Sequence, residues 1–312
     1  MKKTSLIFAI IATSAGLAQA LSYVAGGPSV DPKARDMKWS TNVWYNTALY
    51  ASKPLPSKPG SGDAVSVAWG PYSLDVDQDV NVQSLGVGEG AKLTAQKRNI
   101  RVKKTFGVSI SSGGRKTAVK LEDCNLDFGS GISFGFYDKA QNAEGATVDF
   151  IDCNLISKGD FVVIIPANDR FTNKVAKGIT ATFAGRTKAV FGGGTLIDSI
   201  IKDNPKEWFM KWVFEEKDGK LPFVSFAKNA QINSLDVEVK LKSALRPGKY
   251  PLLELGDKKC SLSLRSITLN GKPYTLGDTA HAGASDVKIE ITPSPTGKDV
   301  KTSNDLVLEV LK

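Results

Sequence analysis

A short sequence that occurs twice constrains the fold of this chain more than any other feature. The two copies are VKLEDCNL at residues 119–126 and VDFIDCNL at residues 148–155, which places them 29 residues apart. In each copy apolar and polar residues alternate, an Asp breaks the alternation, and Cys and Leu restore it. This pattern predicts a strand, a tight turn and a second strand. A repeat of this length made of strands predicts a solenoid.

The repeat also predicts which residues lie beside each other. If each copy is one coil, equivalent residues of neighbouring parallel strands are about 4.8 Å apart. Residues 178–183 (GITATF) form a weaker third copy, 33 residues after residues 145–150. The strong right-handed preference of parallel crossover connections predicts a right-handed coil. The predicted stacked pairs are Asp123 over Asp152, Cys124 over Cys153 and Asn125 over Asn154.

The predicted fold class is all-β: a right-handed parallel β-helix, or β-solenoid, with an N-terminal cap, one short helix and a strand-rich C-terminal part. Pro and aromatic residues are frequent before residue 59, and three glycines at 192–194 indicate the end of the coils. Asn204 and Pro205 can cap and begin a short helix through Trp212, with Trp208 and Trp212 at i and i+4 on one face. The predicted segments are 1–20 as signal peptide, 21–58 as cap, 59–200 as parallel β-helix, and 201–312 as short helix and C-terminal strands.

The first 20 residues have the pattern of an export signal. Lys2 and Lys3 precede the apolar run of residues 6–12, and residues 18–20 (AQA) form a small-x-small cleavage site. No later stretch of the sequence reaches the ~18 consecutive apolar residues that a membrane helix needs. The sequence therefore predicts an exported protein whose location is the periplasm, the outer surface or the extracellular medium.

Three cysteines are an odd number for an exported protein, so a disulfide framework is not expected to organise the fold. Cys124 and Cys153 have a predicted separation that permits a bridge. Stacked inward thiols are the preferred interpretation, because parallel Cβ vectors in register suit the disulfide torsion poorly. Both alternatives remain open at this point.

The N-terminal part resembles a known family of exported proteins. The residues that carry the resemblance are Trp39-Ser40 and Trp44, Pro59, Gly62-Asp63, Val65 and Val67, and VNVQSLGVGEGAKL at residues 80–93. They are similar to the opening of secreted bacterial β-helix proteins of the autotransporter-passenger type, which carry autotransporter-associated β-strands. Residues 245–254 (LRPGKYPLLE) resemble an element that closes many of these proteins. The resemblance implies a right-handed parallel β-helix. A translocating barrel is not expected, so the resemblance does not imply self-secretion.

A basic segment accounts for the positive net charge of +9. Eight Lys and Arg residues lie between residues 97 and 120 with no Asp or Glu among them. Outward cations on an exported β-helix would form a linear track for polyanions. The expected partners are acidic polysaccharide, lipopolysaccharide or a mucin-type glycan, and no nucleic acid is expected in this compartment. A solvated face that discourages edge pairing is the alternative. The predicted ligand-binding residues are Lys97, Arg98, Arg101, Lys103 and Lys120.

Asp123 and Asp152 are the predicted catalytic pair. Two carboxylates about 5 Å apart either share a proton, as a hydrolase acid and base do, or hold a cation such as Ca²⁺. A solvated turn ladder, in which Asn125, Asn154 or Lys120 relieves the repulsion, is the favoured alternative. No other metal or cofactor is expected.

Two further groups of residues offer weaker candidates. Asp75, Asp77 and Asp79 would share one face of a strand on a two-residue period, where a solvated face is expected rather than a hydrolase pair. His281 is the single histidine of the sequence, so a catalytic triad or a His-based zinc site would depend on it alone.

Two functions from different classes remain. The first is a non-enzymatic exported β-helix that acts as a surface or extracellular binding or structural module for acidic glycans or other polyanions. The second is a hydrolase or lyase acting on glycans or mucin-type glycoproteins, with Asp123 and Asp152 beside a basic strip. Turnover of acidic glycans would distinguish the second from the first.

Overall fold

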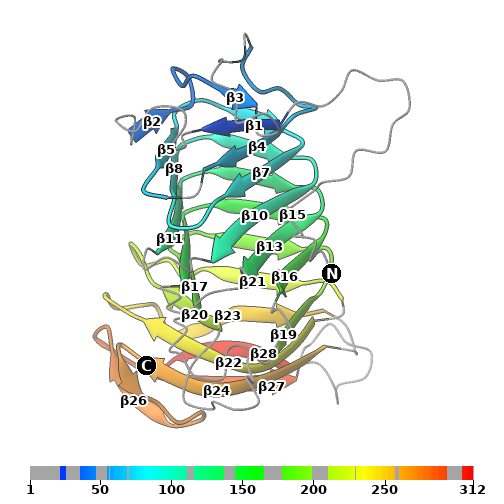
Figure 1. The fold of residues 1–312 in the computed structure, drawn as a ribbon. Helices are drawn as coiled ribbons and strands as arrows, with labels where there is room; N and C mark the ends of the chain where they lie inside the picture. The colour runs from blue at the N-terminus through cyan, green and yellow to red at the C-terminus, as the bar shows by residue number, and fades with distance from the viewer. Residues whose placement is uncertain are drawn as a thin grey trace.

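A computed structural model describes most of the chain as strands stacked in sequence order (Figure 1). Within the described residues every regular element is a β-strand and no helix is present. The predicted signal peptide, Trp208 and the predicted helix start at Asn204 lie outside these residues. The described residues are 22–25, 36–46, 55, 57–68, 70–110, 116–136, 145–164, 178–198, 210–228, 230–256, 260–293 and 304–311.

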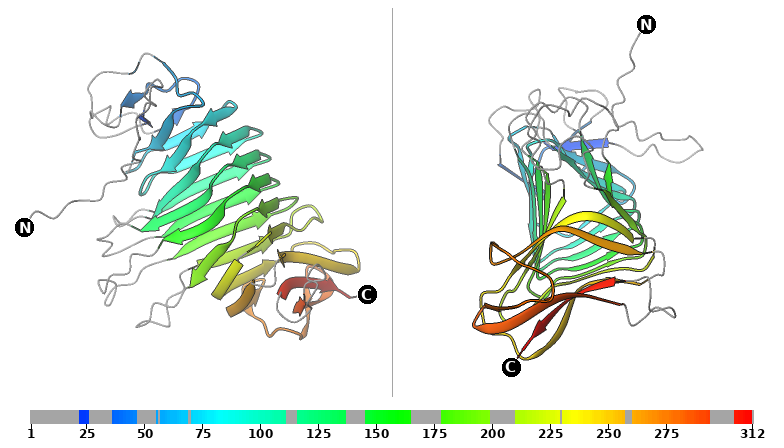
Figure 2. Two further views of the ribbon diagram at one scale, coloured as in Figure 1. Left: turned by 90° about the vertical axis from the view of Figure 1, so that its right-hand side faces the viewer. Right: turned by 90° about the horizontal axis from the view of Figure 1, so that it is seen from below.

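The strands form three mostly parallel sheets, here called sheets I, II and III, and successive strands pass from one sheet to the next (Figure 2). This arrangement is consistent with a parallel β-solenoid and agrees with the predicted all-β class. Strand β22 and strand β24 are long, and a register shift near Leu235 lets them serve both sheet I and sheet II.

The bounds of the strands follow the repeat of three per coil. Sheet I contains β1 (Ser22–Ala25), β4 (Ala64–Val67), β7 (Ser84–Val87), β10 (Thr105–Ile110), β13 (Gly131–Phe136), β16 (Asp160–Ile164), β19 (Thr195–Asp198) and the first part of β22 (Ala230–Lys240). Sheet II contains β2 (Asp36–Lys38), β5 (Ser73–Val76), β8 (Lys92–Gln96), β11 (Thr117–Glu122), β14 (Ala146–Ile151), β17 (Ile179–Ala184), β20 (Met210–Glu215), the rest of β22, and β24 (Ser261–Leu269). Sheet III contains β6 (Val80–Val82), β9 (Asn99–Val102), β12 (Asn125–Phe128), β15 (Asn154–Ser157), β18 (Lys188–Phe191), β21 (Phe223–Phe226) and β23 (Gly248–Leu255).

The register between coils confirms the stacking that the repeat predicts. Strand β11 pairs in parallel with β14, with Val119 opposite Val148, and Asn125 pairs with Asn154 between β12 and β15. The weaker third copy is also in register, since Phe150 pairs with Phe183 between β14 and β17. Cys124 and Cys153 are buried on the inside of these coils.

The Asp of each copy occupies the turn between sheet II and sheet III. Asp123 has φ 53° and Asp152 has φ 54°, which is the left-handed region. Asp and Asn tolerate this conformation better than most residues, because their short polar side chains can hydrogen-bond locally. Lys97 and Gly185 take the same conformation in the neighbouring coils, with φ 56° and 62°. The Asp-Cys-Asn motif is therefore a solution to the geometry of this turn.

Aromatic side chains stacked along the coil axis fill the interior. Phe150 lies between coils, with its ring centroid 5.6 Å from that of Phe183, and Phe183 lies 6.0 Å from Phe214. Phe191 and Phe226 stack in the same way under sheet III, 4.9 Å apart. Burial and stacking of such rings stabilise the narrow core.

The predicted short helix through Trp212 is wrong at its described end. Residues 210–215 form strand β20, in which Trp212 pairs with Ala181 of β17. Met210, Trp212 and Phe214 are buried and lie two residues apart, which is the period of a strand. This pattern determines the conformation, and the helical i, i+4 spacing predicted for Trp208 and Trp212 does not. The coils also continue beyond the three glycines at 192–194, because β18 pairs in parallel with β21 and β19 pairs in parallel with β22.

Short antiparallel strands complete both ends of the stack. At the N-terminal end β3 (Tyr45–Asn46) pairs with β1, and the rings of Trp39 and Trp44 are buried with centroids 4.9 Å apart. At the C-terminal end β28 (Asn304–Val310) pairs with β23, and β27 (Ser285–Pro293) and β26 (Thr279–Ala282) extend the same sheet. Strand β25 (Lys272–Pro273) pairs with β24. These strands cover backbone groups that would otherwise be exposed at a sheet edge.

Replacing Phe150 by Ala is expected to lower the free energy of unfolding by about 3–5 kcal/mol, because it leaves a cavity in a rigid stack of rings. The matched control is Thr147→Ala on the same strand, whose side chain faces outward and should change stability by no more than about 0.5 kcal/mol. Denaturant unfolding of both variants measures the difference. Equal stability of the two variants would mean that the inward and outward faces of β14 are exchanged.

Candidate functional site

A shallow groove crosses the outward face of sheet III over four successive coils. Its volume is about 440 Å³, and it lies over β6, β9, β12 and β15. Because side chains alternate along a strand, each of these strands contributes residues to the groove from its outward positions. The residues that line it are Asp79, Val80, Asn81, Asn99, Ile100, Arg101, Asn125, Leu126, Asp127, Asn154 and Ile156.

A ladder of amide side chains forms one side of the groove. Asn99 donates its side-chain Nδ2–H to Oδ2 of Asp79 at 2.7 Å, and Asn125 donates to Oδ1 of Asn99 at 3.1 Å. The backbone amide and the side chain of Asn99 together lower the pKa of Asp79, so this carboxylate is ionised at neutral pH. Asn154 continues the ladder on the next coil and is exposed. The ladder presents hydrogen-bond donors and acceptors at the spacing of the coils, about 4.8 Å.

A second row, two residues further along each strand, is mixed in character. Arg101 forms an ion pair with Asp127 of the next coil, with 3.3 Å between Nε and Oδ2. Ile156 occupies the equivalent position on the following coil and is 49% exposed. The groove therefore combines amide, carboxylate and guanidinium groups with one exposed apolar side chain, that of Ile156. Such a set suits the hydroxyl groups and apolar ring faces of a sugar polymer.

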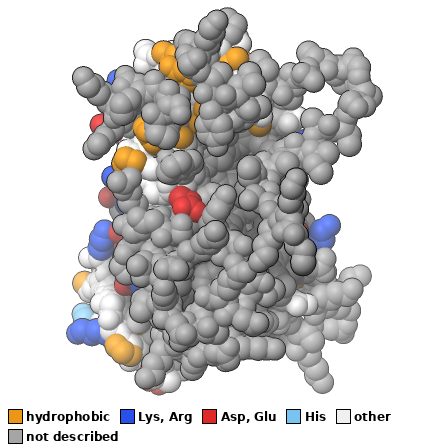
Figure 3. Space-filling model, in the orientation of Figure 1, with side chains coloured by type: hydrophobic (Ala, Val, Ile, Leu, Met, Phe, Trp, Pro, Cys, Tyr) orange, Lys and Arg blue, Asp and Glu red, His pale blue; other side chains and the backbone are white. Residues whose placement is uncertain are grey.

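The five predicted ligand-binding cations do not form one ridge. Arg101 is on β9 of sheet III, whereas Lys120 is on β11 of sheet II and pairs with Glu122 at 3.1 Å. Lys97 and Arg98 lie in the turn that carries the chain from sheet II to sheet III, and this change of face separates Arg101 from Lys120. Among the side chains coloured in Figure 3, Lys and Arg appear in separate small groups, several of them beside Asp or Glu.

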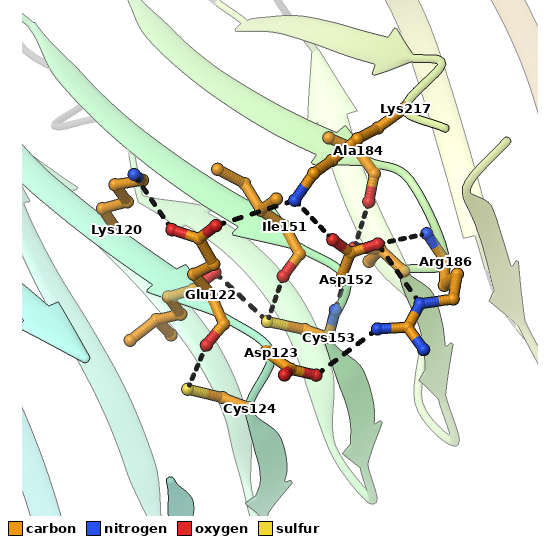
Figure 4. A network of polar contacts seen from close by, with 12 residues as sticks. Lys120, Glu122, Asp123, Cys124, Ile151, Asp152, Cys153, Ala184, Arg186 and Lys217 are labelled. Carbon is orange, nitrogen blue, oxygen red and sulfur yellow. Dashed lines mark hydrogen bonds and ion pairs between the residues drawn. The ribbon is translucent and has the colours of Figure 1, made fainter. Parts of the chain in front are cut away.

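Asp152 is part of a network of polar contacts around the turn column (Figure 4). Its Oδ2 accepts a hydrogen bond from Lys217 Nζ at 2.6 Å, and its Oδ1 accepts one from the backbone N–H of Arg186 at 2.9 Å. The Arg186 side chain reaches both Asp152 and Asp123 at 3.5 Å. Lys217 also lies 3.6 Å from Glu122. Residues from four coils thus share one set of compensating charges.

The contacts of Asp152 outweigh the effect of its burial. Burial of the carboxyl group raises its pKa. The hydrogen bonds from Lys217 and Arg186 and their positive charges lower the pKa by a larger amount, so the pKa of Asp152 lies below its ordinary value. A carboxyl group that is ionised and paired in this way is a poor proton donor at neutral pH. The catalytic role of Asp123 and Asp152 stays a prediction, and these contacts do not favour it.

The same contacts bear on the Ca²⁺ alternative. Both oxygens of the Asp152 carboxylate already face protein cations, with which a metal ion would compete. Within the part of the chain that the structure describes, no group of three or more His, Cys, Asp or Glu residues is arranged to hold a metal ion.

The two cysteine side chains of the repeat contact the backbone. All three cysteines are free and buried. The thiol of Cys124 donates to the carbonyl oxygen of Glu122 at 3.2 Å, and the thiol of Cys153 donates to that of Leu121 at 3.2 Å. The inward orientation that the sequence predicts is therefore confirmed, and both thiols satisfy carbonyl groups at the turn.

The weaker candidates are dispersed. Asp75 lies on β5, Asp77 accepts hydrogen bonds from Ser40 in the turn, and Asp79 belongs to the groove, so they do not share one strand face. His281 pairs with Asp286 at 2.9 Å on the exposed hairpin of β26 and β27.

Sequence reasoning missed the groove itself. Asn125 and Asn154 were recognised as stacked, but Asn99 and Asn81 belong to coils whose turns lack the Asp-Cys-Asn motif. The signal that could have found Asn99 is its 26-residue offset from Asn125, which is shorter than the 29-residue repeat. The ladder itself stays in register, because Asn125 pairs with Asn99 between β12 and β9.

No protein-family model matches the sequence, no curated protein matches it, and no solved structure matches its fold. In the described residues no helix is long and apolar enough to cross a membrane.

Replacing Asp152 by Asn is expected to lower the free energy of unfolding at pH 7 by about 1–3 kcal/mol, because it removes a charged acceptor from two donors. Asn tolerates the left-handed turn, so the substitution does not strain the backbone. Because folding lowers the pKa of Asp152, its contribution is complete above the unfolded-state pKa of about 3.9 and is lost as the pH falls through the lower folded-state value.

The measurement is denaturant unfolding of parent and variant between pH 7 and pH 2, in which the two stabilities should converge below pH 4. The matched control is Asp123→Asn, since Asp123 is more exposed and has one ion pair at 3.5 Å. A pH-independent difference between the parent and Asp152→Asn would contradict the electrostatic explanation.

Proposed function

We propose that this protein is an exported, right-handed parallel β-helix of the autotransporter-passenger type that acts as a surface or extracellular binding module for acidic glycans. The groove on sheet III is the observation that supports the proposal. It spans four coils, which suits a polymer that lies across several strands.

The composition of the groove favours binding over catalysis. Its ionisable side chains are Asp79, Arg101 and Asp127. Asp79 accepts hydrogen bonds from Asn99, and Arg101 and Asp127 pair with each other. Each charge already has a partner, so the groove supplies directed hydrogen bonds without a free acid or base. A binding surface of this kind orients a ligand by its hydroxyl groups.

The export part of the proposal rests on the N-terminal sequence. Lys2 and Lys3, the apolar run and the small-x-small site have the order of a secretory signal. Export would bring the groove into contact with acidic polysaccharide, lipopolysaccharide or mucin-type glycans.

The test replaces Asn125 and Asn154 by Ala and measures the affinity of the mature chain for heparin and hyaluronan. The double variant is expected to bind at least about tenfold more weakly, since it removes two or more hydrogen bonds worth about 0.5–1.5 kcal/mol each. The matched control is Thr147→Ala with Thr182→Ala, two outward positions on sheet II. Thermal unfolding verifies that both double variants remain folded.

Parental affinity in the Asn double variant would overturn the groove as the binding site, as would the absence of polymer binding by the parent. Release of reducing ends or unsaturated uronates from either polymer would instead establish the hydrolase or lyase alternative.

A further inference from the structure

The corner at which sheet III ends and sheet I begins carries a second group of cations. Lys103 and Lys104 follow β9, and Lys158 follows β15 two coils away. Backbone hydrogen bonds between the coils fix their order. The N–H of Lys103 donates to the carbonyl oxygen of Val82, that of Gly129 to the carbonyl oxygen of Val102, and that of Lys158 to the carbonyl oxygen of Phe128. Lys103 and Lys158 are therefore at equivalent positions about 10 Å apart, which is two strand spacings.

The coil between these lysines carries almost no side chain at the corner. A Cβ at Gly129 would lie 1.9 Å from the carbonyl oxygen of Lys103, and one at Gly159 would lie 2.1 Å from that of Ser130. Backbone segments of neighbouring coils are therefore in direct contact here, and neither position has room for a larger residue. The result is a low step between Lys103 and Lys158 over which a ligand can approach both ammonium groups.

Lys103, Lys104 and Lys158 differ from Arg101 and Lys120 in their partners. Arg101 pairs with Asp127, and Lys120 pairs with Glu122. Among the described residues, Lys103, Lys104 and Lys158 are exposed and form no ion pair with an acidic side chain. The acidic side chain nearest along the chain is Asp160, whose Oδ1 accepts the backbone N–H of Gly194 at 2.7 Å.

The corner is continuous with the groove. Lys103 is two residues beyond Arg101 on the same chain segment, a distance of about 6.8 Å along a strand. Lys158 stands in the same relation to Ile156, which also lines the groove. A polymer that occupies the groove therefore reaches the corner within about one sugar-sized step. Lys103 and Lys104 are adjacent in the chain and Lys158 is about 10 Å from Lys103, so neighbouring anionic groups of one polymer can contact all three lysines.

We infer that Lys103, Lys104 and Lys158 form the subsite that binds the carboxylate or sulfate groups of an acidic polysaccharide held in the groove of sheet III. This inference rests on the proposed function. In this proposal the two surfaces have different roles. The amide ladder binds uncharged hydroxyl groups, and the three lysines at the corner select polymers that carry negative charge. The selection depends on charge alone, so it accepts carboxylates and sulfates alike.

The experiment compares dextran with dextran sulfate, two polymers that share a backbone and differ in charge. The parent is expected to bind dextran sulfate at least about tenfold more tightly than dextran at physiological salt. The variant Lys103→Gln, Lys104→Gln, Lys158→Gln should lose most of this ratio and keep its affinity for dextran. The matched control is Lys92→Gln, Lys220→Gln, Lys272→Gln, which removes the same net charge from exposed lysines away from the corner.

The two proposals fail in different ways. If the corner variant keeps the parental ratio between the two polymers, or if the control variant loses it equally, the corner subsite is overturned while the groove stands. If the parent binds neither polymer, the proposed function fails and the corner subsite fails with it. Thermal unfolding confirms that each triple variant is folded, as expected for exposed charges that contribute little to stability.

Discussion

The parallel hydrogen-bond register between successive coils is the constraint on which both the core and the candidate site depend. In β11 and β14 six consecutive residue pairs are in register, and β14 and β17 repeat the same alignment. A slip by one residue would exchange inward and outward side chains along the whole strand. It would expose Phe150 and Phe183, and it would break the amide ladder of Asn99 and Asn125. The core therefore maintains the site, because aromatic stacking inside enforces the alignment that the polar row outside requires.

Several of the ion pairs in this fold join residues of different coils. Arg101 pairs with Asp127, and Asp152 pairs with Lys217, which is 65 residues away in the sequence. A segment that is purely basic in sequence is therefore not purely basic in space. What distinguishes Lys103, Lys104 and Lys158 is their position at a corner where the stacked coils offer Gly and Ser instead of an acid.

The residues of the doubled Asp-Cys-Asn motif serve both the turn geometry and the candidate binding site. The Asp occupies a left-handed turn position, and the Cys turns inward to satisfy a backbone carbonyl group. The Asn begins the sheet III strand and faces outward into the groove. The first two residues of the motif serve the architecture, and the candidate binding function begins at the third.

The sequence by itself determined the stacking of the two copies, the inward cysteines and the all-β class, because the alternation of side chains and the repeat length are local properties of the chain. Tertiary structure decided the rest. Trp212 is part of a strand because β20 pairs with β17 of the neighbouring coil, opposite Ala181, and this pairing buries the Trp212 side chain in the core. The predicted cationic ridge separated because the turn at Lys97 and Arg98 changes the face of the coil. The groove and the lysine corner arise from residues on coils of unequal length, whose alignment no fixed sequence period reveals.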